Sequence, residues 1–118
     1  MTPADETLLL GIVLAGVNGL LLLFSIVMAL NIVERNPVFG LRTPRTLSSD
    51  REWARGNRIA GLVLGSFSLL FFLLLLLRLT EVVSLSAHGL LAGYMLGLIG
   101  STALTVVLGG GWRAPRDA

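Results

Sequence analysis

Residues 7–33 read TLLLGIVLAGVNGLLLLFSIVMALNIV and contain no arginine, lysine, aspartate or glutamate. Two more segments share this property: Ile59 to Leu77, and a longer one from Val82 to Trp112. About 20 apolar residues, at 1.5 Å of rise each, cross the roughly 30 Å hydrocarbon core of a bilayer. Because that core offers the backbone no water, each segment should be an α-helix. The sequence therefore predicts an all-α fold, an integral membrane three-helix bundle with helices at about residues 7–33, 50–78 and 86–108.

The composition is typical of a chain that is solvated by lipid. Of its 118 residues, 54% are hydrophobic and only 14% are charged, against about 25% charged residues in ordinary globular chains. This length allows one domain, residues 1–118. With no cysteine and one histidine, disulfides, thiolate chemistry and a two-histidine metal site within one chain are excluded. We expect a small polytopic membrane protein without a cofactor.

The basic residues, all of them arginine, are concentrated on one side of the predicted helices. Six lie in residues 34–58, between the first two helices, and two lie in the C-terminal tail. On the other side, Arg78 is accompanied by the acidic residues of the N-terminus. Arginine and lysine are enriched on the cytoplasmic side of membrane proteins. We therefore expect the N-terminus outside, and the loop 34–58 and the C-terminus in the cytoplasm. The net charge of +2 does not indicate nucleic-acid binding.

The loop between the first two helices is the least generic part of the chain, and it reads NPVFGLRTPRTLSSDREW over residues 36–53. Pro37 and Pro44 prevent the first helix from continuing. Gly40 supplies a position at which φ is free to be positive. Ser49 and Glu52 have the spacing of a reciprocal capping box. A helix is therefore predicted to begin near Asp50 and to run on into the second span.

Two faces of that helix carry distinct residues at its start. Trp53, Asn57 and Gly61 lie on one face at four-residue spacing. Arg51, Arg55 and Arg58 lie on another side, close to the expected position of the lipid headgroups. Tryptophan and arginine in such positions are typical of anchors in the headgroup region. The alternative is a binding site for a partner protein or a lipid headgroup.

Small residues at four-residue spacing predict close packing of the helices. They are Gly61 and Gly65 in the second helix, and Gly89, Gly93 and Gly97 in the third. Such faces let two helix backbones approach closely. Packing within one three-helix bundle is the simplest interpretation, and homodimerisation is the alternative.

The absence of ionisable carboxylates from the three predicted spans disfavours proton-coupled transport, and the absence of a catalytic cluster disfavours catalysis. A multidrug transporter of similar size needs an ionisable carboxylate inside a span, and none of the three segments has one. Asn18 is the strongly polar residue deep in the first span, and we expect it to form a hydrogen bond between helices. An enzyme would need a carboxylate pair, a metal cluster or a base beside a nucleophile. We therefore expect a protein that is not an enzyme.

The loop carries a long motif, N-P-x-x-G-x-R-T-P-x-T-L followed by S-x-x-x-W and N-x-x-x-G. It resembles the SdpI family of bacterial membrane proteins. The matching positions are Asn36, Pro37, Gly40, Arg42, Thr43, Pro44, Thr46, Leu47, Ser49, Trp53, Asn57 and Gly61. The family's namesake is an immunity protein that protects a producing cell from its own secreted toxic peptide. It is also implicated in signalling, by holding a cytoplasmic repressor at the membrane, and it has additional transmembrane helices.

The resemblance implies a multi-pass protein of the bacterial cytoplasmic membrane that supports resistance to a membrane-active toxic peptide or signals its presence. A partner or lipid is expected to bind the cytoplasmic loop, through residues drawn from the motif. They are Asn36, Pro37, Gly40, Arg42, Thr43, Pro44, Arg45, Thr46, Trp53 and Asn57. The partners expected are the lipid bilayer and a cytoplasmic regulator or another membrane protein. The alternative function is an accessory or assembly subunit of a larger membrane complex, which would use the glycine faces instead.

Overall fold

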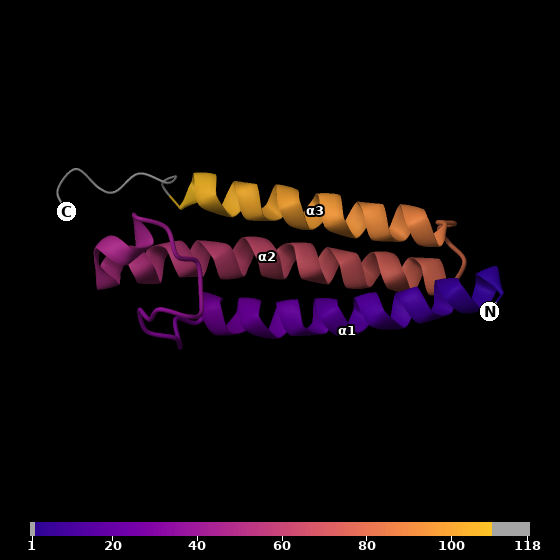
Figure 1. Ribbon diagram of the computed structural model, residues 1–118, viewed down its shortest axis with the longest axis horizontal. Helices are drawn as coiled ribbons and strands as arrows, with labels where there is room; N and C mark the ends of the chain where they lie inside the picture. The colour runs from indigo at the N-terminus through magenta and orange to yellow at the C-terminus, as the bar shows by residue number, and fades with distance from the viewer. Residues whose placement is uncertain (1, 110–118) are drawn as a thin grey trace.

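A computed structural model describes residues 2–109, which form three long helices and, in that range, no strand (Figure 1). Helix α1 spans Pro3–Ala29, α2 spans Asp50–Leu79 and α3 spans Ala87–Leu108, and a short 3-10 helix, η1, covers Thr46–Ser48. The long helices lie side by side with α2 in the middle (Figure 1). Each is long and apolar enough to cross a membrane. The predicted all-α three-helix architecture is therefore confirmed.

The first helix begins and ends about four residues earlier than predicted. At its start, the Thr2 hydroxyl accepts a hydrogen bond from Asp5 N, and the Asp5 carboxylate accepts one from Thr2 N. This capping box, with Pro3 in the first helical position, extends the helix beyond the apolar run. At its end, Asn31 adopts a left-handed conformation, with φ of 56°. A residue in that conformation terminates the helix, so apolarity alone placed the boundary too late.

The starts of α2 and α3 agree with the prediction within one residue. Ser49 caps α2 by accepting a hydrogen bond from Glu52 N at 3.1 Å, and Ser86 caps α3 by accepting one from Gly89 N at 3.0 Å. The reciprocal half of the predicted box at Ser49 is absent, because the Glu52 carboxylate binds arginine side chains instead. One hydroxyl is thus sufficient to start α2.

Burial in the spanning part is inverted relative to a water-soluble protein. Leu20, Leu70 and Leu96 are 57%, 66% and 70% exposed, whereas Asn18 and Ser68 are completely buried. A soluble bundle would place such leucines inside, because water would penalise their exposure. Lipid chains impose no such penalty, and small and polar residues then form the helix contacts. The pattern is that of a chain that uses lipid as its solvent.

A polar cluster in the middle of the bundle connects all three helices. The Asn18 amide of α1 donates to the carbonyl of Ser68 in α2 at 2.9 Å, and the Ser68 hydroxyl lies 3.0 Å from Asn18 Oδ1. Tyr94 of α3 donates its hydroxyl proton to the same Oδ1 at 3.3 Å. The Tyr94 ring packs against Phe71 with the ring centroids 4.4 Å apart. The expected interhelical hydrogen bond of Asn18 is confirmed.

Candidate functional site

The loop between α1 and α2 begins with a turn organised by Asn36. Its Oδ1 accepts hydrogen bonds from the backbone N–H groups of Val38 and Phe39, at 2.9 and 2.7 Å. An asparagine side chain that bonds to the backbone ahead of it mimics a backbone turn. The next residue, Pro37, is exposed. The Phe39 ring packs edge-on against Phe24 of α1, with centroids 5.2 Å apart. The turn is therefore fixed to the end of the first helix.

Two threonine side chains form the centre of the loop. The Thr46 hydroxyl donates to the Leu41 carbonyl at 2.8 Å and accepts from Thr43 N at 2.8 Å. The Thr43 hydroxyl accepts from Thr46 N at 3.1 Å. Both threonines are buried, while Pro44 between them is exposed. Because each hydroxyl satisfies a backbone group that lacks a secondary-structure partner, the loop holds one conformation.

The loop then folds back onto the first turns of α2. Asn57 Oδ1 accepts a hydrogen bond from Leu41 N at 2.7 Å, and the Trp53 indole N–H donates to the Val33 carbonyl at 3.0 Å. Gly40 has φ of +106°, and a Cβ at this position would lie 2.7 Å from Asn57 Oδ1 and 2.9 Å from the Trp53 ring. Only glycine accommodates both that conformation and that contact. Trp53 is 3% exposed, so its predicted role as an anchor in the headgroup region is wrong.

Ion pairs fix three of the six loop arginines. Arg45 lies 3.0 Å from the Glu52 carboxylate, and Arg55 lies 3.6 Å from it. Arg35 lies 3.4 Å from the Asp50 carboxylate. Arg55 also donates to the Gly109 carbonyl at 3.1 Å, which connects the start of α2 to the end of α3. These arginines are part of the folded loop.

The other three arginines, Arg42, Arg51 and Arg58, are exposed. None of them forms a hydrogen bond or an ion pair with another residue of the described range 2–109. Arg51 and Arg58 share one side of α2, seven residues apart, and Arg42 lies in the loop that covers the helix start. Residues 34–58 hold six arginines against three carboxylates, so this end of the molecule has a positive excess.

A cavity of about 450 Å³ opens between the end of α1 and the start of α2. Its lining includes Asn31, Glu34, Arg35, Asp50 and Trp53. Asn31 Oδ1 is buried and, within residues 2–109, accepts no hydrogen bond. Buried acceptors normally have a donor, so Asn31 Oδ1 is an exception among the buried polar atoms of residues 2–109. Except for Trp53, sequence reasoning missed these residues, because only the return of the loop brings them together.

The glycines of α2 are contact points with α1. A Cβ at Gly61 would overlap the backbone of Ser25 and Ala29 and would lie 2.8 Å from Ala29 Cα. A Cβ at Gly65 would lie 3.4 Å from the Ser25 Cβ. The predicted close approach of two helices occurs here within one chain.

The glycines of α3 do not form one packing face. A Cβ at Gly97 would lie 2.5 Å from the Phe67 ring of α2. A Cβ at Gly93 would have no neighbour within 4 Å, and at Gly89 the nearest atom is the hydroxyl of the capping Ser86. Gly97 therefore packs inside the bundle, whereas Gly93 faces outward. Within residues 2–109, no group of three or more His, Asp or Glu side chains is placed to hold a metal ion.

The region of the chain that matches a known protein family includes the loop and the last two helices. A family model described as the SdpI/YfhL protein family matches residues 32–110, about two thirds of the chain. The matched segment begins in the turn after α1 and includes the loop, α2 and α3. No curated protein and no solved structure matches the chain significantly.

Proposed function

The chain belongs to the SdpI/YfhL protein family, and from this premise we propose that it is a non-enzymatic protein of the bacterial cytoplasmic membrane. In this proposal it supports resistance to a membrane-active toxic peptide, or signals the presence of that peptide, through its arginine-bearing loop. The loop faces the cytoplasm and the N-terminus lies outside. The excess of arginine over carboxylate in residues 34–58 supports this orientation.

The observation that carries the proposal is that two different sets of residues hold the loop together and face the solvent. Most of the motif residues bond to one another and to α2, so the loop needs no partner to become ordered. Arg42, Arg51 and Arg58 are then presented on a preformed surface with their guanidinium groups open to solvent. A preorganised surface loses little conformational entropy when it binds. This favours recognition over a purely structural role for the loop.

The chemistry of the three arginines defines the partner. A guanidinium presents N–H groups in a planar fork that matches carboxylate and phosphate oxygens. Each basic residue near an anionic leaflet contributes about 1 kcal/mol, so three of them alone give only modest lipid attachment. The partner that fits best is a cytoplasmic regulator with an acidic surface, docked where the leaflet adds to the attraction.

The experiment is affinity purification from native membranes in a mild detergent, followed by mass spectrometry of bound proteins. We expect a regulator to be recovered with the unchanged chain and to be lost with Arg42→Gln combined with Arg58→Gln. Arg78→Gln removes an arginine from the opposite end of the bundle, and it should leave that recovery unchanged. The same variants are scored for survival of cells exposed to the toxic peptide.

Two outcomes would contradict the proposal. One is full recovery of the regulator and full survival with the double variant, which would remove the loop arginines from the function. The other is equal loss with Arg78→Gln, which would indicate an effect of total charge instead of a site.

One observation favours a second function, that of an accessory subunit. Gly93 faces outward on α3 with no described atom within 4 Å of its would-be Cβ, and the neighbouring Leu96 is 70% exposed. A helix of another membrane protein would approach closely there. Gly93→Leu should release a stoichiometric membrane complex if this function is right, and should have no effect on a loop-centred sensor. Gly97 is unsuitable for this test, because its enlargement would disturb Phe67.

A further inference from the structure

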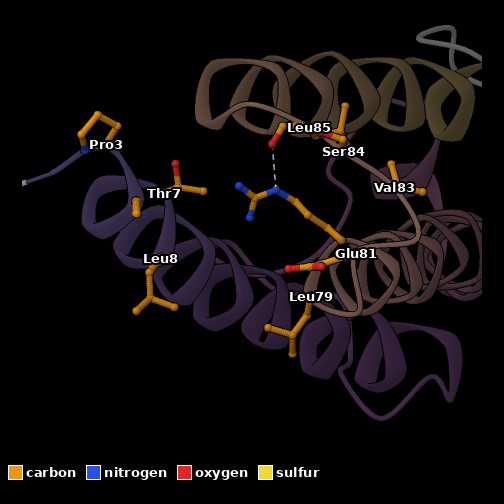
Figure 2. Close-up of a pocket in the computed structure, with 10 residues that line it drawn as sticks. Pro3, Thr7, Leu8, Leu79, Glu81, Val83, Ser84 and Leu85 are labelled. Atoms are coloured by element: carbon orange, nitrogen blue, oxygen red, sulfur yellow. Dashed lines mark hydrogen bonds between the residues drawn. The ribbon is translucent and has the colours of Figure 1, made fainter.

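The end of the bundle opposite the loop contains a larger cavity, of about 710 Å³. It lies between the first two turns of α1 and the connection from α2 to α3 (Figure 2). Thr7 and Leu8 contribute from α1, and Glu81 and Ser84 contribute from the connection. Arg78, in the last turn of α2, also lines it. Neither the family motif nor the loop arginines reach this end.

One bond orients the Arg78 side chain and leaves most of its donors open. Arg78 Nε donates to the Leu85 carbonyl at 3.0 Å, the bond drawn as a dashed line in Figure 2. A guanidinium carries five N–H donors, and the other four form no hydrogen bond with any residue of the described chain. A Cβ at Gly11 would lie 4.0 Å from Arg78 Nη1, so the charge lies over the third turn of α1.

Glu81 brings a negative charge to the same cavity. Its carboxylate points into the cavity, toward α1 (Figure 2). No ion pair joins it to Arg78 in the described range, which spans both residues. One cavity thus holds a cation and an anion that form no direct ion pair with each other. A ligand with both charges would satisfy the two side chains together.

An apolar groove adjoins this cavity and runs along α1 and α2. It has a volume of about 320 Å³ and shares Thr7, Leu8, Arg78 and Leu79 with the larger cavity. Further along, it is lined by Gly11, Ala15 and Leu75, among others. Gly11 and Ala15 lie four residues apart on one face of α1. Because glycine has no side chain and alanine has a single methyl group, the groove there is wide enough for an alkyl chain.

We propose that the cavity and the groove together bind one zwitterionic phospholipid with a primary ammonium headgroup, phosphatidylethanolamine. The Arg78 guanidinium binds the phosphodiester, the Glu81 carboxylate binds the ammonium, and an acyl chain occupies the groove beside Gly11. Guanidinium and phosphate form charge-assisted hydrogen bonds, and an ammonium has three donors for a carboxylate. An anionic lipid without an amine would leave Glu81 unpaired, so the site selects for the zwitterion.

The test measures lipid binding by native mass spectrometry of the purified full chain. Phosphatidylethanolamine, phosphatidylglycerol and phosphatidylcholine are added at equal concentrations. The unchanged chain should retain one phosphatidylethanolamine in preference to the other two. Arg78→Gln and Glu81→Gln should each weaken that retention about fivefold, the factor that corresponds to the roughly 1 kcal/mol of one charged contact at a membrane surface. Glu34→Gln, which removes a charge at the other end of the bundle, is the control and should leave it unchanged.

The groove is tested separately from the charges. Ala15→Leu, one turn further from Arg78 than Gly11, should fill the groove and remove the bound lipid, whereas Gly16→Leu should not, because a Cβ at Gly16 has no described neighbour within 4 Å. Arg78→Lys keeps the charge and should retain most of the lipid, which separates loss of binding from loss of folding.

Three results would overturn the proposal. Retention of phosphatidylglycerol at or above the level of phosphatidylethanolamine would remove the role of Glu81. Unchanged retention with Arg78→Gln would remove the role of the guanidinium. Competition by soluble phosphoethanolamine as strong as that by the lipid would show that the groove takes no part.

Discussion

At the loop end, Trp53 and Asn57 are 3% and 4% exposed beneath a backbone that folds back on α2, while in the spanning part Leu20 and Leu70 are more than half exposed. The loop is stabilised as a soluble protein is, by burial of an aromatic ring and by hydrogen bonds to irregular backbone. The spanning part depends on a few close contacts at small residues and one polar cluster. Specific side-chain contacts therefore stabilise the loop end, where many residue types are present. The leucines of the spanning part mainly provide a surface for lipid.

The largest effect is expected from Trp53→Ala. It removes the side chain that fills the space under Gly40, together with the hydrogen bond to the Val33 carbonyl. Truncation of a buried phenylalanine or tryptophan to alanine costs about 3–5 kcal/mol. Hydrogen exchange in micelles should show loss of protection in residues 36–49, with the middle of α3 still protected. Equal loss of protection in α3 would mean that the loop and the spans unfold as one cooperative unit. That result would contradict the view that different contacts stabilise the two regions separately.

The next effect is expected from Gly61→Ala, which acts on the spanning part. The added methyl group would overlap backbone atoms of Ser25 and Ala29, which have no rotamer by which to move aside. Overpacking of this kind costs about 1–3 kcal/mol. Denaturation in mixed micelles measures the loss of stability. Gly93→Ala is the matched control, and it should be neutral or stabilising because its methyl group meets open space and alanine favours the helix.

Thr46→Val tests the polar part of the loop with little change in volume. The variant leaves the Leu41 carbonyl and Thr43 N without the hydroxyl that now serves both. An unsatisfied buried group costs about 1–3 kcal/mol, and hydrogen exchange should show faster opening of residues 41–48. Thr43→Val, which removes one such bond, should have a smaller effect. The same effect from both variants would contradict the central position of Thr46.

Asn18→Leu should have the smallest effect of the four, even though Asn18 is completely buried. Hydrogen bonds between helices in a membrane average about 0.6 kcal/mol each, because the separated helices also find partners. The Asn18 side chain takes part in three of them, so denaturation in mixed micelles should show a loss of about 1–2 kcal/mol. Val17→Leu, at a lipid-facing neighbour, is the control and should show none. A loss of stability greater than that for Thr46→Val would mean that polar contacts matter more in the spanning part than in the loop, the reverse of what is expected.

The fold could be predicted from apolar length, since three charge-free segments permit few alternatives in a bilayer. The end of α1 could not be placed this way, because the left-handed Asn31 terminates the helix inside an apolar run. The motif contains the loop residues that hold the loop on α2, among them Gly40, Thr46 and Asn57; their binding of a partner or lipid stays a prediction. It did not reveal that Trp53 and Asn57 face inward, because the position of a loop over a helix depends on contacts between residues far apart in the sequence.

The charged sites show the same limit. Charge counting predicted a positive excess at the loop end, but only the geometry separates the paired Arg45 from the open Arg42. The cavity at Arg78 was missed. Its signal in the sequence is one arginine on the side of the membrane that otherwise lacks basic residues. It becomes a site only where the start of α1, the end of α2 and the connection that follows α2 come together.

The polar cluster in the middle of the bundle has a consequence for biogenesis. Asn18 bonds to Ser68 within the α1–α2 hairpin, before any contribution from α3. A hairpin that enters the bilayer during synthesis thus carries no unsatisfied amide into the lipid, where such a group costs several kcal/mol. When α3 emerges, Tyr94 adds its hydroxyl to an acceptor that is already in place. The chain is therefore suited to insertion in two steps, first as a hairpin and then with a single helix that docks onto it.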